Sequence, residues 1–219
     1  MVKSAGTTKV FQPVPEWAHD VLQGLAYWIG YRRCYYRSYP LLEGAITAEL
    51  CELLSAKLDP GQHGKLFCEV PYSNLTQDHT TKSEPDGMRL DLLIAKDPGK
   101  VKDSGKHNFF SSASIAIEVK RGSASTSEIV KDVSRLATLN HLRPDIRTFL
   151  LIVSEEKLPR QFGWFANSEK DHEIIAAKGV IRVDVASAVM KVRRVCKALG
   201  SFKATASQTA VLVEVVSSN

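Results

Sequence analysis

The fold of this chain is decided around residues 114–120, which read SIAIEVK, and around residues 88–95, which read MRLDLLIA. Both stretches are short, apolar and partly alternating, as β-strands are. Each places one acidic residue in this apolar setting, Asp91 in the earlier stretch and Glu118 in the later one. An unpaired carboxylate in a buried strand costs free energy, so both acids must be paired, hydrogen-bonded or bound to a metal.

The chain after residue 120 predicts a helical crossover to a buried strand. Residues 127–140 repeat apolar side chains every three or four positions, which favours a helix capped by Ser127 or Thr126. Residues 146–154 form an apolar run that is typical of a strand buried on both faces. Beyond them we expect three further elements, namely a strand at 179–187, a basic helix at 188–199 and a last apolar strand at 210–216.

The chain before residue 88 predicts two helices and one strand. The helices span residues 15 to about 31 and residues 41–58, and the strand spans 66–72. The whole order indicates an α/β fold with a mixed central β-sheet flanked by helices. We divide the chain into an N-terminal basic and aromatic helical extension, residues 1–40, and an α/β domain, residues 41–219.

Charge is unevenly distributed along the 219 residues. Residues 1–40 carry five Lys or Arg against two acids and residues 188–219 carry five against one, so the ends hold +3 and +4 and the middle holds −2. Basic ends around an acidic middle suit a protein that grips phosphates and holds cations, although solvated basic faces are common too.

The cysteines and the apolar runs exclude several classes of protein. The four cysteines show no CxxC spacing, which argues against a zinc site and for buried free thiols. The longest apolar runs fall short of a membrane-spanning helix, and the N-terminus has no apolar signal core. We therefore expect a cytoplasmic protein without membrane association.

Chemistry is expected on one face of the two acid-bearing strands. Lys120 stands two residues after Glu118, and strand side chains alternate, so both point to the same face. Mg²⁺ prefers oxygen ligands and keeps several waters, so Asp91, Glu118 and the backbone carbonyl of Val119 are the predicted metal ligands, with Mn²⁺ as a substitute. Lys120 would orient or deprotonate the attacking water, or stabilise the charge of the transition state. The alternative is a core salt bridge with no metal.

At these residues the sequence resembles the PD-(D/E)XK nuclease superfamily. The matching pieces are Asp91 in its strand, the ExK tripeptide of residues 118–120 and the crossover helix with its following strand, and the resemblance covers residues 41–154. The resemblance implies a restriction-endonuclease-like αβββαβ core. It also implies a helical glutamate that reaches the metal through water, for which Glu43 is slightly favoured over Glu49. The literal dipeptide at residues 85–86, Pro-Asp, lies in a turn-prone stretch, so Asp91 is the better ligand.

The resemblance implies a Mg²⁺-dependent DNA endonuclease, with a restriction-type homodimer as the first choice because two sites are needed to cut both strands. A structure-specific repair or recombination nuclease is the close alternative. A noncatalytic nucleic-acid-binding subunit and a protein-binding effector are the alternatives from other classes. Asp132 and Arg135 are expected to form a solvated or structural pair. The predicted phosphate contacts are Arg32, Arg33, Arg37, Lys100, Lys102 and Lys106. The aromatic residues among these arginines would stack on bases, or pack on the core or a partner subunit.

Overall fold

The computed structural model describes residues 12–36, 39, 41–58, 65–76, 88–96, 109–155, 181–182, 187–199 and 207–217. Its elements, in chain order, are α1 (Ala18–Tyr35), α2 (Glu43–Lys57), β1 (Lys65–Pro71), α3 (Tyr72–Leu75), β2 (Arg89–Ala95), η1 (Phe109–Ser112), β3 (Ala113–Arg121), α4 (Thr126–Leu142), β4 (Arg147–Ser154), β5 (Ile181–Arg182), β6 (Ser187–Leu199) and β7 (Ser207–Ser217).

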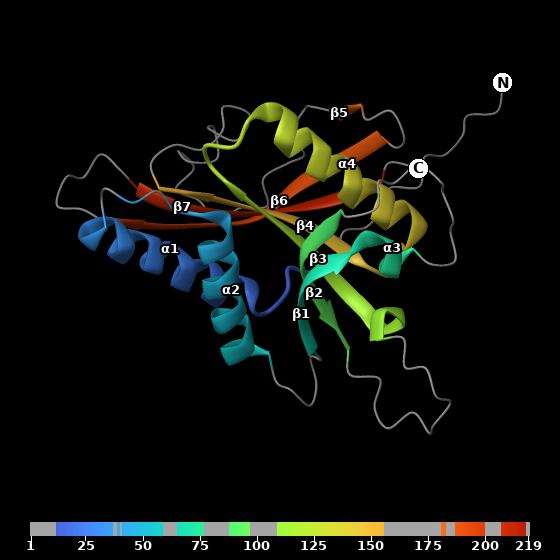
Figure 1. The fold of residues 1–219 in the computed structure, drawn as a ribbon, viewed down its shortest axis with the longest axis horizontal. Coiled ribbons are helices and arrows are strands. Elements are labelled where there is room, and N and C mark those ends of the chain that lie inside the picture. The colour runs from blue at the N-terminus through green and yellow to red at the C-terminus, as the bar shows by residue number, and fades with distance from the viewer. Residues whose placement is uncertain are drawn as a thin grey trace.

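The strands of these described ranges form one seven-stranded sheet in the order β1-β2-β3-β4-β7-β6-β5 (Figure 1). Neighbouring strands β1, β2 and β3 pair antiparallel, and β3 pairs parallel with β4 through the crossover helix α4. Antiparallel pairing then continues from β4 to β7, β6 and β5. The predicted α/β fold with a mixed central sheet flanked by helices is confirmed.

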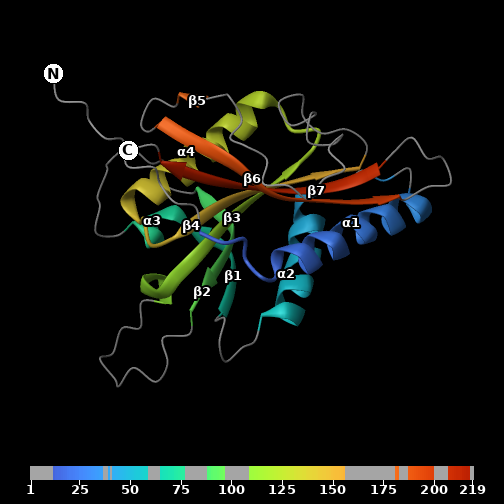
Figure 2. The same ribbon diagram turned by 180° about the vertical axis from the view of Figure 1, so that it is seen from behind.

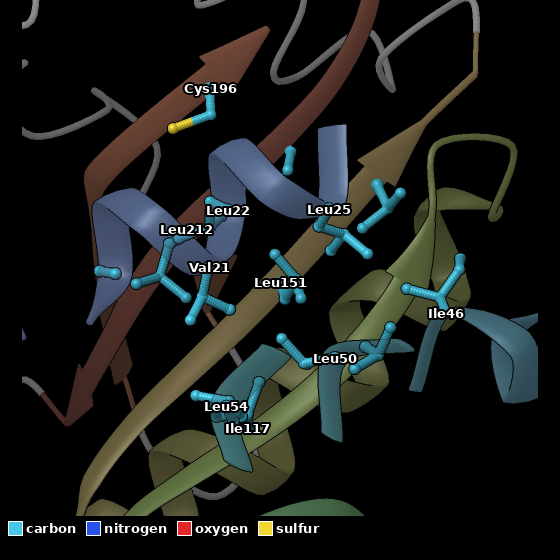
Figure 3. Packing of buried hydrophobic residues seen from close by; sticks show 14 of the residues in the cluster. Val21, Leu22, Leu25, Ile46, Leu50, Leu54, Ile117, Leu151, Cys196 and Leu212 are labelled. Atoms are coloured by element: carbon cyan, nitrogen blue, oxygen red, sulfur yellow. The ribbon is translucent and has the colours of Figure 1, made fainter. Parts of the chain in front are cut away.

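Helices cover both faces of the sheet and create two hydrophobic cores. Helices α1 and α2 pack on one face, where Leu25, Leu50 and Leu54 meet Ile117 and Leu151 of the sheet (Figure 3). Helix α4 packs on the other face, chiefly against β4 and β7, and Figure 2 shows these layers from behind. The first helix therefore shares its core with α2, and the domain boundary at residue 40 stays a prediction.

The basic helix predicted for residues 188–199 is wrong, because this segment is the long strand β6. A register shift between Val192 and Arg194 interrupts the strand. Before it, Met190 and Val192 face the α4 core, and after it Cys196 faces the α1 and α2 core. One extra residue changes which face the apolar side chains occupy. In the sequence this places apolar residues three and four positions apart, which imitates a helix.

Most other boundaries agree with the predictions within a few residues. The N-cap of α4 is Ser125, and not Ser127 or Thr126, because its hydroxyl accepts a hydrogen bond from Glu128 N while the Glu128 carboxylate accepts one from Ser125 N. Of the strand predicted at 179–187, the structure describes β5 and the first residue of β6. No helix among the described residues is long and apolar enough to cross a membrane.

Candidate active site

Asp91 and Glu118 lie side by side on β2 and β3. The two strands pair Leu92 with Ile117, so the next step of the antiparallel register sets Asp91 opposite Glu118. The Oδ2 atom of Asp91 accepts a hydrogen bond of 2.6 Å from the backbone N–H of Val119. This hydrogen bond holds the carboxylate of Asp91 against the backbone of Val119, the residue whose carbonyl is the other predicted ligand.

Glu118 is a buried carboxyl group with only 2% of its surface exposed. Tyr72, at the start of α3, donates a hydrogen bond of 2.6 Å from its hydroxyl to Glu118 Oε1. Burial, followed by the negative charges of Asp91 and Asp132, raises the pKa of Glu118 to about 9, although the Tyr72 hydrogen bond opposes the shift. With this pKa, and with no bound metal ion, Glu118 keeps its proton at neutral pH.

Lys120 is held between two carboxylates. Its Nζ atom lies 3.2 Å from Asp132 Oδ2 and 3.3 Å from Glu43 Oε2, and it donates a hydrogen bond of 3.1 Å to the Val119 carbonyl. Burial lowers the pKa of Lys120, but Asp132, Glu43 and Asp91 outweigh burial and the pKa lies above its ordinary value. The side chain is thus a fixed positive charge.

The structure brings Glu43 to this group and places Glu49 elsewhere. Glu43 is the first residue of α2, and besides contacting Lys120 it accepts a hydrogen bond of 3.5 Å from the backbone N–H of Arg121. Glu49 lies beside Glu52, and burial together with the Glu52 charge raises its pKa. The N-terminus of α2 therefore reaches the end of β3 from the face opposite α4.

Asp132 belongs to this site, although the sequence indicated it only as a partner of Arg135. The expected ion pair with Arg135 is present at 3.0 Å, and of the solvated and structural alternatives the structural one is found, because only 2% of Asp132 is exposed and it also contacts Lys120. A signal existed in the sequence, since residue 132 lies on the apolar stripe of Ile129 and Leu136. No sequence pattern pointed to Tyr72.

The acids of this group outnumber its cations. Four acids, Asp91, Glu118, Asp132 and Glu43, surround two cations, Lys120 and Arg135, which leaves a charge of −2 when all are ionised. Burial is the largest cause of the raised pKa of Glu118, and the negative charges of Asp91 and Asp132 add to it. Among the described residues, no group of three or more His, Cys, Asp or Glu side chains is placed so that it could hold a metal ion by itself. Two carboxylates with the Val119 carbonyl would suffice for Mg²⁺, which retains several waters.

The predicted phosphate contacts fall into two groups. Arg32 and Arg33 lie in the last turn of α1, and the Arg32 guanidinium lies 5.5 Å from the ring centre of Trp28 and 6.0 Å from that of Tyr36. Arg37, Lys100, Lys102, Lys106 and the dipeptide at residues 85–86 lie outside the described residues.

No family model, curated protein or solved structure matches this chain in any of the three comparisons.

Proposed function

We propose that this chain is a metal-dependent deoxyribonuclease that hydrolyses phosphodiester bonds with a site of the PD-(D/E)XK type. The observation that supports this most directly is the group at the end of β3, where a buried Glu118 beside Asp91 shares its surroundings with a fixed Lys120. Mg²⁺ is the proposed cofactor and Mn²⁺ its substitute. A restriction-type homodimer and a structure-specific nuclease both use this chemistry.

Asp91, Glu118 and the Val119 carbonyl would hold the metal, which would neutralise the phosphate and lower the pKa of a water. Glu118 must lose its proton to serve as a ligand, so metal and proton compete for this side chain. Tyr72 donates to Glu118 Oε1 and fixes which way the carboxylate faces. Asp91 is fixed in the same way by the Val119 N–H.

Lys120 acts best as a charged donor, because its pKa lies above the ordinary value. A protonated amine cannot accept the proton of the attacking water. It can donate hydrogen bonds to that water or to a phosphate oxygen and so offset the negative charge that grows in the transition state. Glu43, whose side chain is 42% exposed, and the buried Asp132 hold the amine from two sides.

The test is cleavage of supercoiled plasmid and of linear duplex with and without a single-stranded tail, in Mg²⁺ or Mn²⁺. The wild type should cut these DNAs, and the variants Asp91→Asn and Lys120→Met should not. The control variant Asp145→Asn, which removes the exposed partner of Arg143, should cut as fast as the wild type. The proposal fails if the wild type cuts none of these DNAs with either metal, or if the two site variants cut as fast as the wild type.

A noncatalytic DNA-binding subunit is the second candidate, and the ion pairs of Lys120 with Asp132 and Glu43 are the observation that favours it. Metal distinguishes the two, because a ligand that binds the folded state raises its stability by RT ln(1 + [L]/Kd). A metal site predicts a higher melting temperature in Mg²⁺ or Mn²⁺ that Asp91→Asn removes. A core salt bridge predicts no response to either ion.

A further inference from the structure

Helix α1 and the residues after it expose a row of tyrosines on the side away from the sheet. Five rings form this surface, which we call the tyrosine face: Tyr27 at 63% exposure, Tyr31 at 61%, Tyr35 at 69%, Tyr36 at 52% and Tyr39 at 69%. The opposite side of α1 is buried against the sheet, so the core does not need these rings. Single exposed aromatic residues are ordinary, but five within thirteen residues indicate a binding surface.

The arrangement of the rings suits flat ligands. Tyr27, Tyr31 and Tyr35 follow one another at intervals of four residues, which places them along one side of the helix. The rings of Tyr31 and Tyr35 are in contact, with centroids 4.7 Å apart and planes tilted by 43°. The guanidinium of Arg32 lies over the Tyr36 ring. Rings with an arginine over them match the platforms on which unpaired bases stack.

Charge identifies the partner as a polyanion. Residues 27–39 contain three arginines and no acidic residue. A second copy of this chain would bring an equally positive surface against the first, and the two would repel. Duplex DNA would offer phosphates to the arginines, but its bases are stacked on one another and offer no free faces to the tyrosines. Single-stranded DNA offers both phosphates and base faces.

The tyrosine face also leads to the candidate active site. Tyr39 lies four residues before Glu43, and the intervening Leu42 is 62% exposed. Helices α1 and α2 pack on the same face of the sheet and against each other (Figure 1). A strand bound along α1 would therefore continue toward the N-terminus of α2, where Glu43 contacts Lys120.

We propose that the tyrosine face stacks the bases of a single-stranded DNA segment that leads to the scissile phosphate. The inference rests on the proposed nuclease function and narrows its substrate to DNA with a single-stranded segment beside the cut. It favours the structure-specific nuclease over the restriction-type enzyme.

Binding is measured by fluorescence anisotropy with labelled oligo(dT) of about 20 nucleotides and a duplex of equal length, in EDTA so that no cleavage occurs. The wild type is compared with Tyr31→Leu/Tyr35→Leu, which removes two rings but keeps apolar side chains, and with Tyr31→Phe/Tyr35→Phe, which keeps the rings. The leucine pair should bind oligo(dT) about 25-fold more weakly, from a fivefold loss at each ring. The phenylalanine pair should bind like the wild type. All variants should keep the wild-type melting temperature, because both rings lie outside the core.

The proposal is overturned if the leucine pair binds oligo(dT) as the wild type does, or if the wild type prefers the duplex. It is also overturned if light scattering shows a lower molar mass for the leucine pair than for the wild type while DNA binding is intact. The tyrosine face would then be an interface between two copies of this chain. Because binding is measured without metal, the test of the tyrosine face is independent of the test of the nuclease activity. Ring-dependent binding without any cleavage in Mg²⁺ or Mn²⁺ would refute only the nuclease, and cleavage with ring-independent binding would refute only this inference.

Discussion

The protonation of Glu118 makes the metal-free protein sensitive to pH in a direction that can be worked out. The usual pKa of a glutamate is 4.5, and burial beside Asp91 and Asp132 raises that of Glu118 to about 9. Between these values the folded state holds a proton that the unfolded state has lost. The stability that this side chain contributes is therefore fully present below pH 4.5 and is lost as the pH rises toward 9.

Glu118→Gln isolates this effect, because glutamine keeps an oxygen that accepts the Tyr72 hydrogen bond and does not titrate. Each pH unit in the window changes the free energy of unfolding of the wild type by about 1.4 kcal/mol relative to the variant. From pH 5.5 to 8.5 the free energy of unfolding of the variant should rise by about 4 kcal/mol relative to that of the wild type. This is a large fraction of the roughly 5–15 kcal/mol that is usual for a whole domain.

The assay is urea denaturation in EDTA at several pH values, for the wild type, Glu118→Gln and the control Glu16→Gln, which removes an exposed carboxylate. The free-energy difference between the control and the wild type should not change with pH. Adding Mg²⁺ should flatten the pH dependence of the wild type, because a bound cation favours the ionised carboxylate, and should leave Glu118→Gln unchanged. Parallel curves for wild type and Glu118→Gln in EDTA would refute the reasoning.

Three further predictions concern other parts of the molecule. Asp132→Asn should slow cleavage about tenfold to a hundredfold and move the alkaline limb of the pH–rate profile to lower pH, because Lys120 loses a charge that raises its pKa; an equal loss at every pH would mean a purely structural role. Leu50→Ala, at a position with 1% exposure, should lower the free energy of unfolding in urea by about 3 kcal/mol, and a change below about 1 kcal/mol would contradict the packing. Burial and a neighbouring thiol raise the pKa of Cys51 to about 12, so iodoacetamide at pH 7.5 should alkylate it far more slowly than the exposed Cys34, as peptide mass spectrometry would show.

The sequence predicted the elements that depend on local pattern. The strand around Glu118 and the crossover helix that follows it were found because hydrophobic period and polar breaks agree there. The segment 188–199 was missed because a bulge alters the period of a strand, and only the pairing with β7 reveals it. Local pattern also says little about strand order, since β7 enters the sheet between β4 and β6 through contacts that are remote in sequence.

The candidate site also contains residues that local pattern predicts and residues that only the tertiary structure identifies. Asp91, Glu118 and Lys120 were predicted because strand alternation places them on one face. The choice between Glu43 and Glu49 needed the tertiary structure, because it depends on which acid of α2 contacts Lys120 from the face opposite α4, and that acid is Glu43. The buried position of Asp132 could have been predicted from the sequence, because residue 132 lies on the apolar stripe of its helix. A carboxylate there costs free energy unless a cation contacts it.

The composition of this group argues for a function beyond stability. A core salt bridge needs one acid for each base, and well-packed apolar residues are often at least as stable as a buried ion pair. Here four acids meet two cations. Burial, together with the charges of Asp91 and Asp132, raises the pKa of Glu118 to about 9, so without a metal its carboxyl group keeps a proton at neutral pH. Such an arrangement costs stability in the free protein above pH 4.5. A divalent cation would offset the excess of −2, and we therefore infer that the acids serve metal binding and not the packing of the sheet.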